Sequence, residues 1–330
     1  MRKTPQGYAP APGYLAEQMA GLTEFRSLAL PSYTIVEFEP LLDSANNTPA
    51  DWLKIATAVV EHDPGYDGFV VIHGTDTMAY TSSALAFLLS GLRKPVILTG
   101  SQIPLCEVRS DGVENLITAL LIAGDSPLPE VCLYFGGRLL RGCRAVKTSA
   151  SGLSAFESPN YPPLGAAGID LMIHWAAVQP PPPPNIPLWV DHRLLPQVGV
   201  LKLYPGIQIE LLRACLASGL QGLVLETYGV GGAPDNDPAL LQTIASACER
   251  GTVIVSVTQC RQGVVNLGTY ATTSSLARSG VIGGQDLTTE AAFTKLFYLL
   301  GLGLEPEVVR QQMQQNLRGE LTPARPEWHK

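Results

Sequence analysis

Hydroxyl, carboxyl and amine side chains that could act on a carbonyl group follow apolar runs of the sequence. Thr75 and Asp76 come directly after DGFVVIHG at 67–74, and Lys147 follows VCLYFGG at 131–137 after a short loop. If Lys147 lies beside Asp76, their ion pair would hold Thr75 and ease removal of its hydroxyl proton. The three residues would then form a catalytic triad. Alternatively, Asp76 is an ordinary helix N-cap and Lys147 an ordinary loop charge.

Asp43 and Ser44 form a second candidate pair, in the segment LLDSANNT at 41–48. A strand is predicted to give way to this pair before a helix that opens at Pro49. Asp43 could bind the α-amino group of an amino acid and Ser44 its carboxylate, or the two could form only an Asx turn and a cap. The polar turn TGS at 99–101 ends another predicted strand, and adjacent turns of this kind predict one pocket mouth.

The elements expected to position these residues alternate between short strands and longer helices. β-branched and aromatic runs predict strands over 33–38, 68–73, 95–100, 131–137, 199–204, 223–229 and 253–257. Helical spacing with polar starts predicts helices over 49–61, 78–89, 111–123, 210–217 and 238–249. This alternation is typical of an α/β fold with largely parallel sheets flanked by helices. Residues 1–30 contain no predicted strand, although a doubly wound domain normally opens with its central strand.

A proline run, QPPPPP at 179–184, divides the chain into two predicted domains. Consecutive prolines cannot donate backbone hydrogen bonds and favour an extended conformation, so residues 179–192 are expected to form a semi-rigid linker. The larger domain, 1–178, is expected to be flavodoxin-like and to hold most of the candidate site. The smaller domain, 193–330, is expected to be a second α/β unit.

Composition and charge exclude several classes of partner. The chain has 330 residues, a net charge of −7 and 46% hydrophobic residues, which favours a packed protein that repels nucleic acid and anionic lipid. Its apolar stretches fall short of the roughly 20 residues that span a membrane, and the first twenty residues lack a signal-like apolar run. Six cysteines without C-x-x-C spacing and five histidines without ligand spacing predict free thiols, no metal and a cytoplasmic protein.

Longer stretches of the sequence resemble the L-asparaginase family, and its bacterial cytoplasmic type I branch in particular. The most specific are HGTDTMAYT at 73–81 and RSDGVENL at 109–116, and TYGVGGAP at 227–234 and QNLRGELTP at 315–323 also match. The resemblance implies a two-domain α/β enzyme that hydrolyses L-asparagine to L-aspartate and ammonia. It also implies that no cofactor is used and that the enzyme is a homodimer or homotetramer.

Site residues follow from the same resemblance. It implies that Asp43 and Ser44 bind the substrate together with Thr75 and Asp76, and that Lys147 completes the triad. The segment QGYAPAPG at 6–13 resembles the mobile lid of the family, so Tyr8 is expected to reach the substrate.

One family motif does not occur in this sequence. In the family, the first strand ends in a Thr-Gly-Gly-Thr turn whose last threonine attacks the substrate, and no such turn is present. We therefore expect Met1 to be an internal methionine of a longer protein with about 16 further residues, enough for a strand and a turn. Two alternatives are an amino-acid-binding relative that has lost the attacking group and the amidotransferase subunit built on the same fold.

Three further positions depart from the family or bear on regulation. Gly232 replaces an asparagine that reaches toward a neighbouring subunit, and Val146 replaces a threonine that helps to bind a second asparagine in allosteric members. Cys260 matches another part of that effector pocket. Because a valine side chain forms no hydrogen bond, we expect allosteric activation to be weakened or absent.

Overall fold

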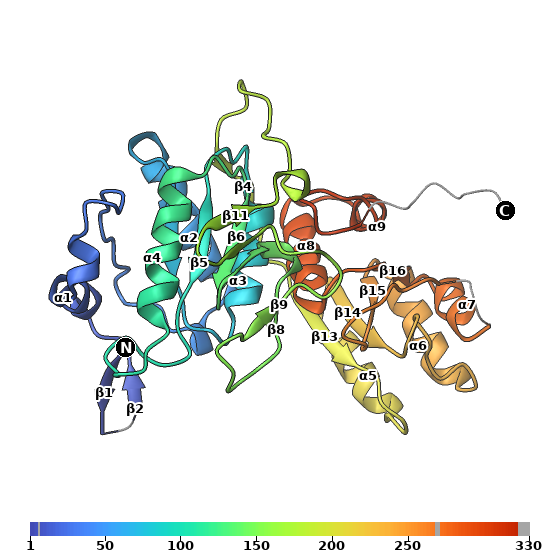
Figure 1. Cartoon of the computed structure of the whole chain (residues 1–330). Helices are drawn as coiled ribbons and strands as arrows, with labels where there is room; N and C mark the ends of the chain where they lie inside the picture. Colours follow the sequence, from blue (N-terminus) through green and yellow to red (C-terminus); the bar gives the residue numbers. More distant parts are fainter. Residues whose placement is uncertain (6, 268–270, 323–330) are drawn as a thin grey trace. The chain divides into compact units, whose positions relative to one another are not determined.

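The computed structural model describes residues 1–5, 7–267 and 271–322, which divide into two compact units. Unit 1 comprises Met1–Ser158 and Pro162–Val190, and unit 2 comprises Pro159–Tyr161 and Asp191–Lys330. Each unit has its own sheet with helices packed against it (Figure 1). The predicted α/β class with two sheet-containing domains is therefore confirmed.

The sheet of unit 1 has six strands in the order β11-β10-β7-β6-β5-β3. Its parallel strands are β3 (Phe69–Ile72), β5 (Val96–Thr99) and β6 (Val131–Phe135). Its antiparallel strands are β7 (Arg138–Arg141), β10 (Gly165–Ala167) and β11 (Leu171–Ile173). The direction changes at a tight hairpin between β6 and β7, where Gly136 and Gly137 have φ of 55° and 77°. Such positive angles favour glycine.

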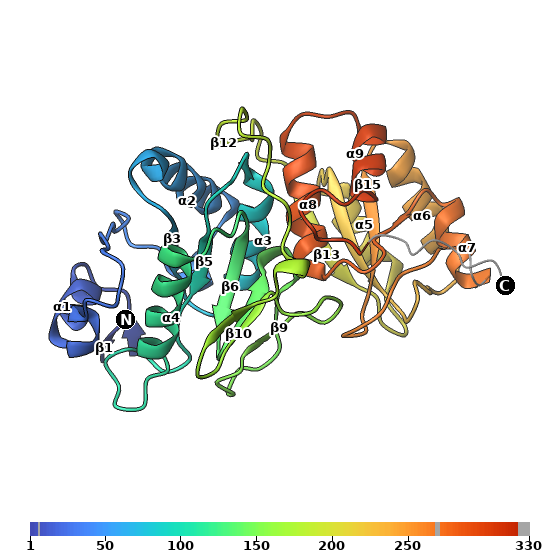
Figure 2. The same ribbon diagram turned by 45° about the horizontal axis from the view of Figure 1, so that its top comes forward.

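Helices cover both faces of this sheet. They are α2 (Pro49–His62), α3 (Met78–Leu88) and α4 (Gly112–Asp125), with α1 (Tyr14–Gly21) farther out. Figure 2 shows α4 on one face and α2 and α3 on the other. Helix α2 begins at Pro49, as predicted, and Thr48 and Asp51 form a capping box at this end.

Unit 2 contains a smaller, fully parallel sheet in the order β13-β14-β15-β16. Its strands are β13 (Val198–Lys202), β14 (Gly222–Thr227), β15 (Val253–Thr258) and β16 (Ile282–Gly283). Its helices are α5 (Ile209–Ala217), α6 (Pro238–Glu249), α7 (Ala271–Arg278), α8 (Thr289–Gly301) and α9 (Pro306–Met313). Leu212, Leu240 and Ile244 pack with the sheet residues Leu223 and Leu225 in one hydrophobic core.

Short strands also pair outside the two main sheets. They are the two-stranded pairs β1 (Arg2–Thr4) with β2 (Gly7–Ala9), β4 (Leu89–Ser90) with β12 (Trp189–Val190), and β8 (Val146–Lys147) with β9 (Phe156–Glu157). Among the described residues, no helix is both long and apolar enough to cross a membrane.

Three predictions about strands are wrong. Residues 33–38 form no strand, and none precedes Asp43. Within the described ranges, β3 ends the sheet and no strand pairs with 33–38, so the apolar pattern there lacks the ladder partner that a strand requires. Ile35 and Val70 instead both pack on the hydrophobic cluster around Phe25. Residues 1–30, predicted to lack strands, contain the short β1–β2 hairpin.

A buried ion pair fastens the chain after α9 to α8. Lys295 Nζ lies 2.6 Å from Glu320 Oε1, and neither side chain is exposed to solvent. Lys295 also donates to the carbonyl of Met313 at 3.0 Å, while the Glu320 carboxylate accepts from the backbone N–H of Leu317 at 3.0 Å. Because both charges are fully enclosed, each depends on the other for compensation.

We expect the substitution Glu320→Gln to lower the free energy of unfolding by about 3 kcal/mol, because it leaves the Lys295 ammonium buried without a counter-charge. Urea denaturation followed by circular dichroism measures the change. The matched control is Glu210→Gln, which removes an exposed pair with Arg213 and should change stability little. Equal effects of the two substitutions would show that the buried pair does not anchor this segment.

Candidate active site

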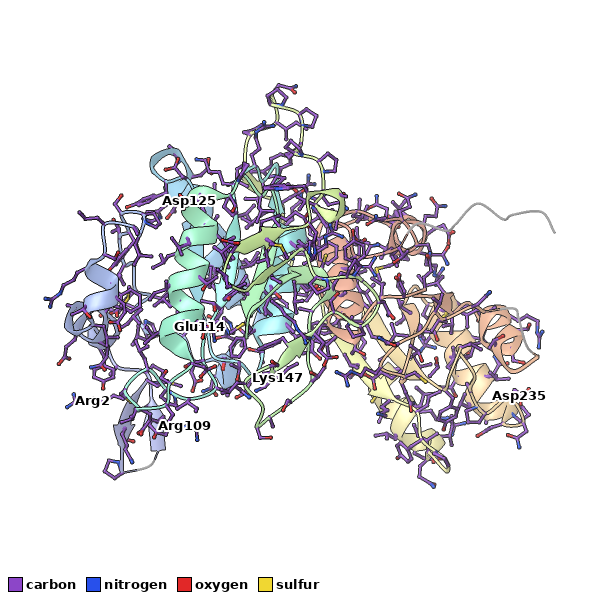
Figure 3. The ribbon with its side chains drawn as sticks, viewed as in Figure 1. Arg2, Arg109, Glu114, Asp125, Lys147 and Asp235 are labelled. Atoms are coloured by element: carbon purple, nitrogen blue, oxygen red, sulfur yellow. The ribbon has the colours of Figure 1, made fainter. Side chains whose placement is uncertain are left out.

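The structure brings Thr75, Asp76 and Lys147 together at one end of the unit 1 sheet. Lys147 Nζ donates to Thr75 Oγ1 at 2.9 Å and to Asp76 Oδ1 at 2.8 Å. Thr75 is buried, whereas the Asp76 side chain is 66% exposed and that of Lys147 is 21% exposed. Lys147 is the second residue of β8, where it pairs with Phe156 of β9 (Figure 3). A half-buried ammonium group therefore bridges a shielded hydroxyl and an open carboxylate.

The Thr75 hydroxyl has a defined orientation. It accepts a hydrogen bond from Lys147 and donates its own proton to Gln102 Oε1 at 3.0 Å. The Gln102 amide nitrogen donates to the carbonyls of Ser149 at 3.4 Å and Gly152 at 3.2 Å, which turns its oxygen toward Thr75. The sequence analysis did not predict Gln102 as a site residue. Its position directly after the polar turn at 99–101 was the only feature of the sequence that pointed to it.

Parallel strands and close backbone contacts fix the turn that holds Thr75. β3 and β5 pair in parallel, and the His73 N–H continues their ladder by donating to the Thr99 carbonyl at 2.9 Å. A Cβ atom on Gly74 would lie 2.2 Å from Ser44 Oγ, and one on Gly100 would lie 2.2 Å from the His73 carbonyl oxygen. Only glycine allows these segments to approach so closely, so Ser44 is brought against the Thr75 turn.

Asp43 forms the Asx turn that the sequence analysis gave as the alternative to substrate binding. Its carboxylate accepts from the Ala45 N–H at 3.3 Å and from Asn46 Nδ2 at 3.3 Å. Ser44 is buried, and its carbonyl accepts from Thr77 Oγ1 at 2.7 Å. The cap is therefore present, and the Asp43 side chain remains partly open to solvent.

Tyr8 lies on β2, and its side chain is exposed. Its hydroxyl donates to Glu107 Oε1 at 2.6 Å, on the loop that follows β5. This hydrogen bond to a carboxylate raises the pKa of Tyr8. The contact ties the N-terminal hairpin to that loop. The Tyr8 hydroxyl thus bonds Glu107, whereas Lys147 bonds the other candidate residues Thr75 and Asp76.

The three positions singled out for regulation and assembly are Val146, Gly232 and Cys260. Val146 precedes Lys147 on β8, where it pairs with Glu157. Gly232 forms an antiparallel bridge with Tyr228, and Cys260 has an exposed thiol. Weakened allosteric activation stays a prediction. In the part of the chain that the structure describes, no group of three or more His, Cys, Asp or Glu side chains is placed to hold a metal ion.

A buried histidine, His73, forms hydrogen bonds with the segments around Thr75. His73 Nδ1 hydrogen-bonds the Gly74 carbonyl at 2.7 Å, so this nitrogen bears the proton. Nε2 then accepts from Asn47 Nδ2 at 2.8 Å and Thr81 Oγ1 at 3.0 Å. Burial lowers the pKa of His73, because the charged ring would be poorly solvated. Since the unfolded chain takes up this proton more readily, the contribution of His73 to stability is lost as the pH falls below about 6.5.

Comparisons with known proteins assign both halves of the chain to related families. Residues 1–179 match the family model described as Asparaginase, N-terminal, and residues 197–313 match the Glutaminase/Asparaginase C-terminal domain. The chain is 50% identical over 324 residues to L-asparaginase 1 of Escherichia coli K12, covering 98% of this chain and 95% of that protein.

Solved structures are similar over almost the whole chain. The crystal structure of L-asparaginase I from Vibrio cholerae matches with a TM-score of 0.89 and 46% identity, covering 98% of this chain and 95% of the other. The thermostable L-asparaginase from Thermococcus kodakarensis matches with a TM-score of 0.86 and 35% identity, covering 98% and 96%.

We expect the substitution Asn47→Asp to raise the pKa of His73 by about one unit, because a carboxylate beside Nε2 stabilises the protonated ring. An NMR titration of the histidine ring signals measures this shift, with the other histidine signals as internal controls. An unchanged His73 titration in the variant would mean that Asn47 does not set the protonation state of the ring.

Proposed function

Because the chain belongs to the asparaginase family, we propose that it hydrolyses the side-chain amide of L-asparagine to give L-aspartate and ammonia. The observation on which this site assignment rests is the contact of Lys147 Nζ with both Thr75 Oγ1 and Asp76 Oδ1. The arrangement is suited to amide hydrolysis, because the departing nitrogen must receive a proton before it leaves as ammonia.

The hydrogen bonds give the proposed proton path a direction. Lys147 donates to Thr75, and Thr75 donates onward to an acceptor that is the Gln102 oxygen in this structure. When asparagine is bound, its side-chain amide takes the place of that acceptor. Thr75 then gives its proton to the leaving nitrogen as it receives one from Lys147. Asp76, 2.8 Å from Lys147 Nζ, holds the ammonium group in position until the transfer.

The remaining site residues hold the substrate in this proposal. The Asp43 carboxylate binds the α-ammonium group of asparagine, and the Ser44 hydroxyl binds its α-carboxylate. Support comes from the placement of Ser44 against Gly74, next to Thr75, and from the partly exposed Asp43 carboxylate. Tyr8 is proposed to cover the bound substrate as part of a lid.

The attacking group in the family is a threonine of a Thr-Gly-Gly-Thr turn, which the printed sequence lacks. We keep a threonine nucleophile as part of the proposal: its oxygen bonds to the side-chain carbonyl carbon of asparagine as the carbon–nitrogen bond breaks and ammonia leaves. The proton of the attacking hydroxyl replaces the one that Lys147 gave to the relay, and a water molecule then hydrolyses the covalent ester to release L-aspartate. Thr75, Asp76 and Lys147 are assigned to proton transfer. We also propose that the enzyme works in the cytoplasm as a homodimer or homotetramer, as the family resemblance implies.

We expect Lys147→Met to lower kcat for L-asparagine by at least about 100-fold, because the proton relay loses its donor. Thr75→Val should have a similar effect, while Thr75→Ser should retain much of the activity because it keeps the hydroxyl. Ammonia and aspartate release by the protein, purified from the cells that make it, measures each rate.

The matched control is Lys54→Met, which removes a lysine paired with Asp51 on the surface of α2. This variant should keep the wild-type kcat. The proposed relay is wrong if Lys147→Met retains the wild-type rate, or if Thr75→Val is as active as Thr75→Ser.

A further inference from the structure

The antiparallel end of the unit 1 sheet leaves a strand edge open. β11 pairs with β10 on one side, and within the described ranges no strand pairs with its other side. The His174 N–H donates to the Leu164 carbonyl at 2.7 Å, and the Asp170 carbonyl accepts from the Gly168 N–H at 3.1 Å. Since backbone direction alternates along a strand, Leu171 and Ile173 point their N–H and C=O groups toward the open edge.

The side chains along this edge are apolar and exposed. Leu171 is 42% exposed, Met172 59% and Trp175 53%, and Ile169 is fully exposed. The segment 169–175, IDLMIHW, contains no lysine or proline, the residues that commonly protect an open strand edge. Contiguous apolar exposure of this kind marks a surface that another protein covers.

We propose that β11 pairs antiparallel with β11 of a second copy of this chain, about a two-fold axis that passes beside Met172. The inference rests on the homo-oligomer of the proposed function and names its interface. An open strand edge can pair with the same edge of a second copy, because two antiparallel copies of one strand are related by a two-fold axis. The two sheets then continue into one another across the axis.

Charge complementarity selects the register. With the axis at Met172, Asp170 lies opposite His174 of the partner subunit, and Leu171 lies opposite Ile173 of the partner subunit. His174 Nδ1 is bonded to the Pro163 carbonyl at 2.9 Å, so Nε2 is left to face the carboxylate. Asp170 and His174 would form a non-hydrogen-bonded pair, the type in which side chains approach more closely.

Neighbouring registers lose this complementarity. The open-edge backbone groups also permit an axis at Leu171 or at Ile173. The first places Asp170 opposite the methionine of the partner, and the second places His174 opposite it. Only the axis at Met172 places an acid opposite a base while it pairs the apolar side chains of Leu171 and Ile173.

Disulfide cross-linking tests this register directly. At the axis, residue 172 faces itself with Cα atoms about 4.5 Å apart, a separation that a disulfide can bridge. Met172→Cys should therefore form a covalent dimer on mild oxidation, seen on a non-reducing gel. Leu171→Cys faces residue 173 and should cross-link much less. Val108→Cys, at a fully exposed position, and the wild type with its native cysteines give the background.

Light scattering after size exclusion tests the interface itself. Met172→Arg places two like charges together at the axis and should halve the mass of the wild-type oligomer, whereas Val108→Arg should not change it. A monomeric wild type would overturn both the homo-oligomer and this interface. If the wild type is oligomeric but Met172→Cys cross-links no more than Val108→Cys, the strand pairing is wrong and the rest of the proposed function stands.

Discussion

The proposed chemistry depends on the placement of one ammonium group, that of Lys147. It is held 2.9 Å from the Thr75 hydroxyl and 2.8 Å from the Asp76 carboxylate. Without that charge, the Thr75 hydroxyl would lose its hydrogen-bond donor and the carboxylate its partner. With it, the hydroxyl has one fixed donor and one replaceable acceptor, which is the arrangement that a proton relay requires.

The rest of unit 1 holds these groups at the end of the sheet where β3 and β5 finish. The parallel pairing of β3 and β5 brings the turns after both strands together, and Gly74 and Gly100 let those turns pack without a side chain between them. Gln102 and His73 then complete the hydrogen bonds around Thr75 and the turn. A hydrogen-bonded scaffold therefore surrounds the Asp76 carboxylate, whose side chain is 66% exposed to solvent.

The sequence was most informative where local chemistry determines structure. Polar residues directly after apolar runs made Thr75 and Asp76 candidates, and the structure places both in contact with Lys147. The helices that begin at Pro49, Met78 and Pro238 start where the sequence predicted. The prediction for Lys147 had weaker support, because the role of a lysine in a predicted loop depends on which residues lie near it in space. The same is true of Gln102, whose role depends on carbonyl groups of a distant loop.

Errors arose where structure depends on a partner segment. Residues 33–38 have the composition of a strand but no described strand pairs with them, so pattern alone could not decide their conformation. The three-residue strand β11 was too short to detect, although its pairing builds the antiparallel end of the sheet. Long-range pairing is not encoded in local periodicity, which explains both outcomes.

A crystal structure of the protein with L-aspartate, the proposed product, tests the central claim most directly. We predict that one oxygen of the aspartate side chain replaces the Gln102 oxygen as hydrogen-bond acceptor of Thr75. The α-ammonium group should lie beside Asp43 and the α-carboxylate beside Ser44. Aspartate bound away from Thr75 and Lys147, or bound with its α-carboxylate at Thr75, would contradict this assignment of the active site.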